Sequence, residues 1–367
     1  MIAAPSVPRG PRLVLLRYLS GALLGRTFIA CAALLGLMEV LALLEQMTPI
    51  LQRHLGLYGV LTYMVLHTPL MMQTALPLSL LIGGLTLLTA MTVSSEMTIL
   101  RSAGLSALGL MLYLLPATFM LGVISTVVED QVTPRAELEL AGWWNQTDPE
   151  PEKGHSFWVH SESWVAHIGY ITGRGRQVHD IDFYEQGPDG LLRRARHADM
   201  AVSGPGYWLA RNVKSWTVPE QGNIPAPVPE AEEKIPSDLS ARQVLRLSLD
   251  NAPLSISTMR RGLKGRESIG QSPAWVRSAI LERLFRPFAF IVMLLLALPV
   301  VYIPPRVGFR SWLPVWCLGA GLLFIITQGV FRAMGNAALL PAPVATVPGL
   351  IIFTLAAGAV LLRNEDK

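Results

Sequence analysis

The sequence predicts a mixed membrane protein in which six transmembrane α-helices, arranged as three plus three, flank an inserted all-β, jellyroll-like domain. Composition is the first observation behind this fold class, because the 367 residues are 51% hydrophobic and only 15% charged, whereas soluble domains are about 25% charged. The second is that the apolar residues gather in runs longer than the roughly 20 residues needed to cross a bilayer. A long polar stretch, Pro134–Ser272, divides these runs into two halves.

The N-terminal membrane half covers residues 1–133 and holds three predicted spans, which are Thr27–Leu44, Leu61–Thr89 and Leu105–Val128. A group of arginines precedes the first span and places the N-terminus in the cytosol by the positive-inside rule. Pro69 and Pro77 remove backbone hydrogen bonds from the second span. We therefore expect a kink there, with the membrane crossing beginning near Leu70.

The polar stretch, taken as a domain over residues 134–272, follows an odd number of spans, so it lies opposite the N-terminus, in the periplasm. It opens with a helical extension, Pro134–Trp144, and continues with short runs rich in β-branched and aromatic residues, which predict strands. The predicted strands are Ser156–His160, Trp164–Ile171, Val178–Tyr184, Arg194–Ser203, Tyr207–Arg211 and Val213–Val218. Pro219–Pro236, rich in Pro and Glu, is expected to be an exposed connector before two short helices, Leu239–Leu249 and Leu254–Leu263.

The C-terminal membrane half covers residues 273–367 and holds the other three spans, which are Ala274–Val301, Leu313–Met334 and Val344–Leu362. An even number of crossings returns the tail, Arg363–Lys367, to the cytosol. The sequence therefore predicts a multi-pass protein of the bacterial inner membrane with both termini cytoplasmic and its large domain periplasmic.

The polar residues do not build a catalytic site. The sequence contains no phosphate-binding GxxxxGK[ST] loop and no nucleophile elbow, and every Lys lies outside the predicted spans. Several histidines of the polar domain invite a metal site, but His160 and His167 differ by an odd number and would point to opposite faces of one strand. We expect no catalytic residue, no metal and no cofactor in this chain, and an energy source outside it.

The stretch Thr92–Ser106 connects the second and third spans on the cytosolic side and predicts a small amphipathic helix. Ser94 or Ser95 can cap its N-terminus, Glu96 suits the helix dipole in the first turn, and Gly104 is a natural stop. A charged, capped helix at the tip of two spans can dock into a soluble partner. An ordinary loop between two helices explains the same spacing equally well.

Several motifs, in order and with this topology, resemble the LptF/LptG family of lipopolysaccharide export permeases, also called YjgP/YjgQ. They are Pro69 and Pro77 in the second span, Ser95-Glu96, Arg101-Ser102-Ala103-Gly104, Glu129 with Pro134, Leu254-Ser255-Ile256-Ser257, and Arg283-Leu284-Phe285-Arg286-Pro287. The match covers nearly the whole chain. The segment before the fourth span and the loop Leu339–Pro343 resemble the LptG branch of the family more than the LptF branch.

The resemblance implies a permease subunit of an ABC transporter that extracts lipopolysaccharide from the inner membrane for export to the outer membrane. The implied partners are a second, LptF-type permease, two copies of a cytosolic LptB-type ATPase that binds ATP and Mg²⁺, an LptC-type protein and a periplasmic bridge. The helix within Thr92–Ser106 would couple to the ATPase, with Glu96 as the main docking residue and Ser95, Arg101 and Gly104 in support.

The resemblance also implies a lipid site. The candidates for contact with the lipid headgroup are Arg53, Arg135, Arg332 and Glu39, and those for the acyl chains are Met38, Leu41, Phe324 and Phe331. Packing between helices explains the four apolar residues equally well. Family members often carry basic residues towards the end of the first span, but this chain has no Lys or Arg between Thr27 and Gln52. A lipid with less phosphate, a bridging divalent cation or a shifted contact would each explain this departure.

Two functions of other classes remain open. A mechanotransmission-type ABC permease would act on a periplasmic partner without moving lipid, but that family usually has four spans. A membrane-embedded lipid-modifying enzyme would need a polar catalytic cluster within the spans, which the sequence does not supply.

Overall fold

The computed structural model describes residues 9–151, 155–160, 164–187, 191–218, 226–249, 252–303 and 311–365. The chain divides into two compact units. We call them the helical unit, which comprises Met1–Leu43, Thr68–Glu129 and Ser272–Lys367, and the sheet unit, which comprises Leu44–His67 and Asp130–Gln271. The fold class is confirmed, because the described residues contain six helices that are long and apolar enough to cross a membrane, together with a separate antiparallel sheet.

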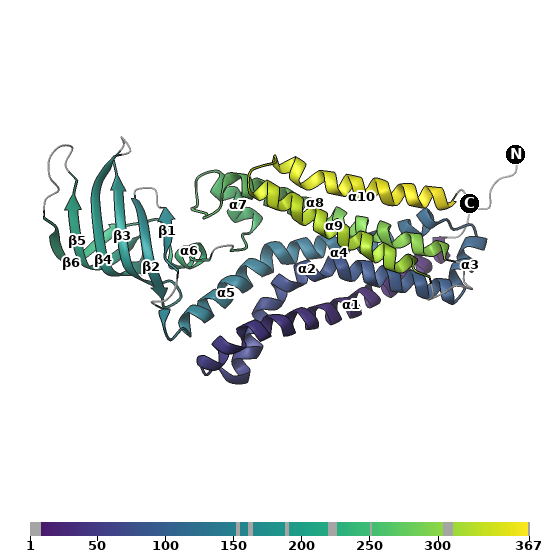
Figure 1. Ribbon diagram of the computed structural model, residues 1–367, viewed down its shortest axis with the longest axis horizontal. Helices are drawn as coiled ribbons and strands as arrows, with labels where there is room; N and C mark the ends of the chain where they lie inside the picture. The colour runs from purple at the N-terminus through teal and green to yellow at the C-terminus, as the bar shows by residue number, and fades with distance from the viewer. Residues whose placement is uncertain are drawn as a thin grey trace. The chain divides into compact units, whose positions relative to one another are not determined.

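The six apolar helices lie where the sequence predicts them (Figure 1). They are α1 (Arg9–Gln52), α2 (Gly56–Val93), α4 (Ala107–Val127), α8 (Pro273–Ala297), α9 (Leu313–Asn336) and α10 (Ala342–Glu365). The first helix begins before Thr27 because the Leu-rich residues ahead of it also favour helix. In α2, Pro69 and Pro77 lie inside one continuous helix, and the chain passes between the two units just before Pro69.

Close contacts between helices organise the helical unit. Its core of buried Leu, Val, Met and Phe side chains includes the C-terminal part of α8, from Phe290 to Ala297, and α8 packs against α4, α9 and α10. A Cβ atom added at Gly122 would lie 2.7 Å from the Cα of Pro287, so α4 and α8 cross where only glycine fits. A Cβ atom added at Gly83 of α2 would likewise lie 2.7 Å from the Cα of Thr27, so α1 and α2 are in close contact there.

Shorter elements join the spans. The helix α3 (Glu96–Ser102) connects α2 to α4, and the 3₁₀-helix η3 (Leu298–Tyr302) extends α8. A π-helix, η1 (Val128–Val132), follows α4 and leads into α5 (Thr133–Gln146), which matches the predicted helical extension. The boundary between the two units falls within η1, between Glu129 and Asp130.

Among its described residues, the sheet unit has one six-stranded antiparallel sheet whose strands are ordered as they follow in the sequence. They are β1 (Phe157–His160), β2 (Trp164–Thr172), β3 (Gln177–Gln186), β4 (Leu192–Gly204), β5 (Tyr207–Thr217) and β6 (Val228–Pro236). The two predicted strands on either side of Asn212 are one strand, β5. Asn212 has a left-handed backbone with φ of 54°, and this break in the pattern separated the two runs in the sequence.

The prediction that Pro219–Pro236 is a connector is wrong for residues 228–236, which form β6, while 219–225 lie outside the described residues. The strand lies at the edge of the sheet, where proline is tolerated because one row of N–H groups needs no partner. Its side chains are almost all exposed, apart from the buried Ile235. A strand with only one buried apolar residue carries too little alternation to be recognised from sequence.

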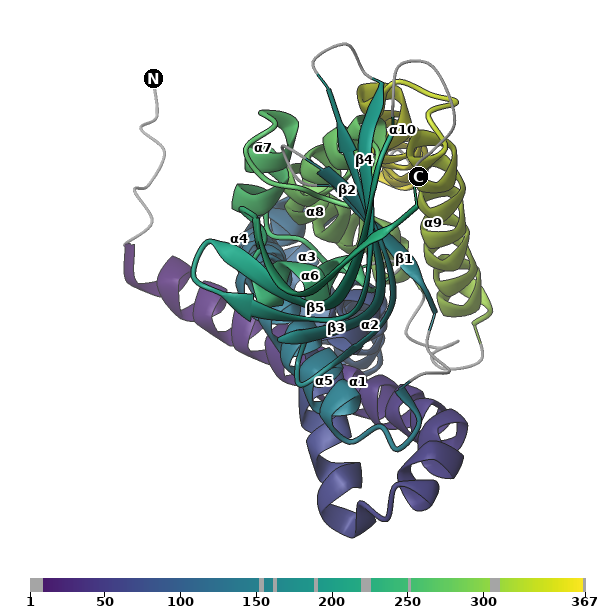
Figure 2. The same cartoon turned by 90° about the vertical axis from the view of Figure 1, so that its left-hand side faces the viewer.

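The sheet is strongly curved (Figure 2). Along β3, β4 and β5 the alternation of buried and exposed side chains changes phase at the same level of the sheet. Asp180 of β3 and Asn212 of β5, both with positive φ, lie at this level. The buried face holds the second core, over which α6 (Ala241–Leu247) packs, and Trp208 donates a hydrogen bond from Nε1 to the carbonyl of Leu239 at 3.0 Å.

Candidate functional site

The candidate coupling residues lie together on and around α3. Ser95 precedes the helix in a left-handed conformation with φ of 63° and makes no capping bond with its side chain, so the expected serine cap is absent. Met97 is buried in the core of the helical unit and anchors the helix. Gly104 follows the helix with φ of +86°, which favours glycine and agrees with the predicted stop.

The carboxylate of Glu96 is held by two hydroxyl groups. Ser94 donates from Oγ to Oε1 at 3.1 Å, and Tyr18 of α1 donates from its hydroxyl to Oε2 at 3.0 Å. Both oxygens of the carboxylate are therefore engaged, and hydrogen bonds to a charged acceptor are among the stronger ones in proteins. Sequence reasoning missed Tyr18, because 78 positions separate it from Glu96.

The other end of α3 contacts the second half of the chain. The guanidinium of Arg101 lies 5.2 Å from the centre of the Tyr302 ring, at the end of η3. Between the two ends, Ile99 is 66% exposed. The helix thus presents Glu96, Ile99 and Arg101 while a buried methionine and two tyrosines fix its position.

A second group of charged side chains lies within the helical unit, and we call it the arginine–glutamate cluster. It consists of Glu129 of η1, Glu282, Arg283 and Arg286 of α8, and Arg332 of α9. Glu129 lies 2.7 Å from Nε of Arg286 and 3.4 Å from Nε of Arg283. Glu129, Arg283 and Arg286 are nearly buried, whereas Glu282 is partly exposed and contacts Arg332, whose side chain is 52% exposed.

Only Arg332 of this cluster was among the predicted site residues. Glu129, Arg283 and Arg286 appeared in the sequence as parts of family-like motifs, without a role. A signal was present, because charged residues at the ends of apolar helices are buried at a high energetic cost unless they are paired. What the sequence could not supply was the pairing, since 154 positions separate Glu129 from Arg283.

The four predicted headgroup residues do not gather in one unit. Arg332 and Glu39 belong to the helical unit, where Glu39 is 3% exposed and accepts a hydrogen bond from Thr68 at 3.2 Å. Arg53 and Arg135 belong to the sheet unit. Both are engaged within their own unit. Arg53 stacks over Trp144 at 4.3 Å and pairs with Asp148 at 3.4 Å, and Arg135 donates a hydrogen bond to Oε1 of Gln131 at 3.5 Å.

The predicted acyl-chain residues differ in burial. Phe324 is 2% exposed and packs edge-on against Phe353 at 5.2 Å between ring centres, so it contributes to the core of its own chain. Leu41 is exposed, and Met38 and Phe331 are half-buried. The exposed face of α1 thus carries Leu41 towards lipid or a partner, whereas helix packing accounts for Phe324.

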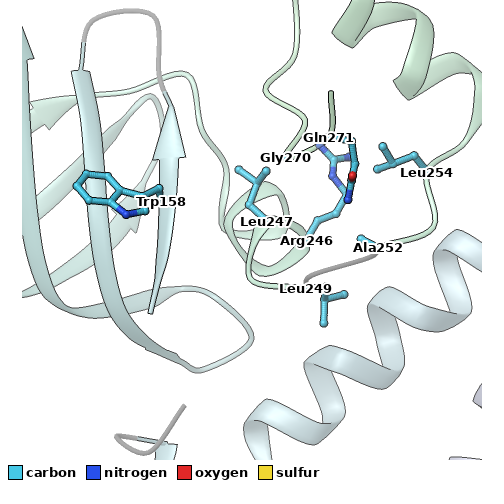
Figure 3. Close-up of a pocket in the computed structure, with 8 residues that line it drawn as sticks. All are labelled: Trp158, Arg246, Leu247, Leu249, Ala252, Leu254, Gly270 and Gln271. Carbon is cyan, nitrogen blue, oxygen red and sulfur yellow. The ribbon is translucent and has the colours of Figure 1, made fainter. Parts of the chain in front are cut away.

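The sheet unit contains a small cavity of about 170 Å³ beside α6 (Figure 3). Its lining includes Trp158 of β1, Leu247 and Arg246 of α6, and Gln271. Arg246 is occupied, because it donates to Glu267 at 2.7 Å. Within the described part of the chain, no group of three or more His, Cys, Asp or Glu side chains is placed to hold a metal ion.

Comparison with known proteins identifies the family. The profile of the lipopolysaccharide export system permease LptF/LptG family matches residues 17–363. The chain is 21% identical over 359 residues to the lipopolysaccharide export system permease protein LptG of Haemophilus influenzae, covering 95% of this chain and 98% of that protein. It is 20% identical to LptG of Escherichia coli strain K12, covering 87% and 89%. The chain is therefore a multi-pass membrane protein that belongs to the lipopolysaccharide export permease LptF/LptG family.

Proposed function

We propose that this chain is the LptG-type permease subunit of an ABC transporter that extracts lipopolysaccharide from the inner membrane and passes it to a periplasmic bridge. Energy comes from two copies of a separate LptB-type ATPase in the cytosol, which bind ATP and Mg²⁺. The observation that carries the proposal is α3, a short anchored helix that presents a fixed carboxylate between two apolar helices. A helix of this kind suits a partner that pushes on the membrane helices from one side.

Exposed apolar surface supports pairing with a second permease of the LptF type. In the most apolar windows of α1 and α9 only 17% of the residues are buried within the chain, against 67% for α2 and α8. Such helices face lipid, a partner or a cavity between partners. A cavity between two permeases would suit a lipid with several acyl chains, and Leu41, Met38 and Phe331 are the candidates that remain at least partly accessible for it.

Arg332 is the headgroup candidate that the geometry favours. Its guanidinium is half-exposed, and its contact with Glu282 keeps it near the buried arginines of the cluster. The cluster holds three arginines and two glutamates, so its net charge is positive and suits lipid phosphates. In this arrangement the termini of the chain are cytoplasmic, and the sheet unit is periplasmic, where it would hand the lipid to an LptC-type protein and the bridge.

Co-purification from native membranes tests the ATPase part of the proposal. The tagged wild type is compared with Glu96→Arg and with a matched charge reversal at an exposed glutamate of α1, Glu45→Arg. We expect the wild type and Glu45→Arg to bring down an LptB-type ATPase and a second six-span permease. Glu96→Arg should lose the ATPase and keep the permease, because reversing the charge repels the cationic group that docks there.

Other outcomes would separate the alternatives. A chain that purifies alone and is unaffected by Glu96→Arg would contradict the proposal and reduce α3 to a loop between spans. An ATPase-bound complex without co-purifying lipid would favour mechanotransmission to a periplasmic partner. Lipid modification without ATP would favour a membrane-embedded enzyme.

A further inference from the structure

The beginning of α1 is fixed against the core of the helical unit, and Tyr18 lies there. Leu19 and Leu23, one residue and five residues further along, are fully buried. Tyr18 itself is exposed, yet its hydroxyl donates to Oε2 of Glu96 at 3.0 Å. The buried neighbours therefore fix the helix backbone at Tyr18, and the hydroxyl of Tyr18 reaches the candidate docking carboxylate.

This hydrogen bond restricts a side chain that would otherwise be free. Glu96 lies in the first turn of a helix of 7 residues, which is too short to be rigid by itself. Ser94 holds the other carboxylate oxygen but belongs to the same segment. Tyr18 is thus the contact in the described residues that ties this carboxylate to a different membrane helix. An acceptor fixed before binding loses less entropy when a partner arrives.

The far end of α3 has a matching contact. Arg101 lies over the ring of Tyr302, which ends the 3₁₀ extension of α8. One tyrosine thus links α3 to α1, and another links it to the C-terminal half of the membrane helices. If a bound partner displaced α3, the hydrogen bond between Glu96 and the Tyr18 hydroxyl would pull on α1.

We propose that Tyr18 is a positioning residue for ATPase coupling: its hydroxyl orients the Glu96 carboxylate to receive a cationic side chain of the ATPase, and it transmits movement of α3 to α1. This inference rests on the proposed function, and it assigns to α1 a direct part in coupling. The partner surface that fits would offer an Arg or Lys to Glu96 beside an apolar contact for Ile99.

The test removes one oxygen atom. Tyr18→Phe keeps the ring and loses the bond, while Tyr58→Phe makes the same change at an exposed tyrosine of α2 that lies outside α3 and its contacts. Permease pairs carrying each variant are titrated with purified LptB-type ATPase. We expect Tyr18→Phe to weaken binding about three- to tenfold, in line with the loss of one hydrogen bond, and Tyr58→Phe to bind like the wild type.

The same change in a Glu96→Ala background shows whether Tyr18 acts through Glu96. The hydroxyl has no carboxylate to orient there, so Tyr18→Phe should cause no further loss of binding. Amide hydrogen exchange, measured on the permease pair without ATPase, reports the rigidity of α3 independently of ATPase binding. Tyr18→Phe should speed exchange of the amides of residues 96–102, whereas Tyr58→Phe should not.

Each contrary result has a distinct meaning. If the wild type binds no ATPase, the proposed function fails and the inference falls with it. If the wild type binds and Tyr18→Phe binds equally well, only the inference is overturned. An equal loss in the wild-type and Glu96→Ala backgrounds, or unchanged exchange in α3, would also overturn it.

Discussion

Glu129 is the residue on which the arginine–glutamate cluster depends. It lies between Arg283 and Arg286, and all three side chains are close to fully buried. Removing one partner of a buried ion pair leaves an uncompensated charge, which is far more destabilising than losing an exposed pair. The π-helix around Glu129 fits this role, since π-turns often occur where a side chain must be directed to a functional position.

Glu129→Gln should therefore destabilise the helical unit by about 3 kcal/mol. A matched control is Glu139→Gln, because Glu139 is half-exposed and pairs with Arg174 at 3.6 Å. The control should change stability by less than about 1 kcal/mol. Thermal unfolding of the purified variants in the same detergent compares the two, and equal shifts would mean that the buried cluster contributes no more than a surface pair.

The residue scale also shows where sequence reasoning ended. Glu96 and Arg101 could be assigned to one short helix, and Gly104 to its end, because they are neighbours in the chain. Tyr18, Glu129 and Arg283 could not be given partners, because their contacts join positions far apart in the sequence. Pairing of this kind depends on how helices pack, which periodicity and capping rules do not determine.

At the scale of elements, Glu267 joins α6 to α7 (Ile256–Leu263). It accepts from Arg246 of α6 and from Arg261 of α7, both at 2.7 Å. Burial alone would raise the pKa of Glu267, but the hydrogen bonds from the two arginines hold it below the ordinary value of 4.5. A carboxyl with a depressed pKa in the folded state contributes stability above its unfolded pKa.

This contribution should be lost as the pH falls below 4.5 and through the folded pKa of Glu267. Glu267→Gln removes the charge at every pH, so the variant should be less stable than the wild type at neutral pH. The difference between the two should shrink on acidification. Melting temperatures of both proteins from neutral to acidic pH measure this, and a constant difference would show that the ion pairs do not act through the carboxylate charge.

Helices and strands with a strong periodicity of apolar residues were predictable from the sequence, and those with a weak periodicity were not. Apart from α1, which extends well beyond Thr27–Leu44, the apolar helices and most of the strands lie within a few residues of their predicted positions, because burial imposes a period on the sequence. The strand β6 was missed, since an exposed edge strand with two prolines needs little apolar alternation. At Asn212 the alternation of apolar and polar residues is interrupted, and the sequence therefore predicts two strands where the structure has the single strand β5.

At the scale of the whole molecule, the described part of the chain combines six apolar helices with a separate sheet unit. The sequence supports this division because a polar stretch interrupts its apolar runs. What it could not supply is the unit boundary within η1, or the assignment of Leu44–His67 to the sheet unit. Contacts such as that of Arg53 with Trp144 and Asp148 account for that assignment.

The most direct measurement of the central claim is ATP-dependent release of lipopolysaccharide from proteoliposomes. The vesicles contain the permease pair with its LptB-type ATPase, and an LptC-type protein and bridge protein outside accept the lipid. We predict release with ATP and Mg²⁺ for the wild type and for Glu45→Arg, and none for Glu96→Arg. Equal release by Glu96→Arg, or ATP hydrolysis by the wild type without any lipid release, would contradict the account.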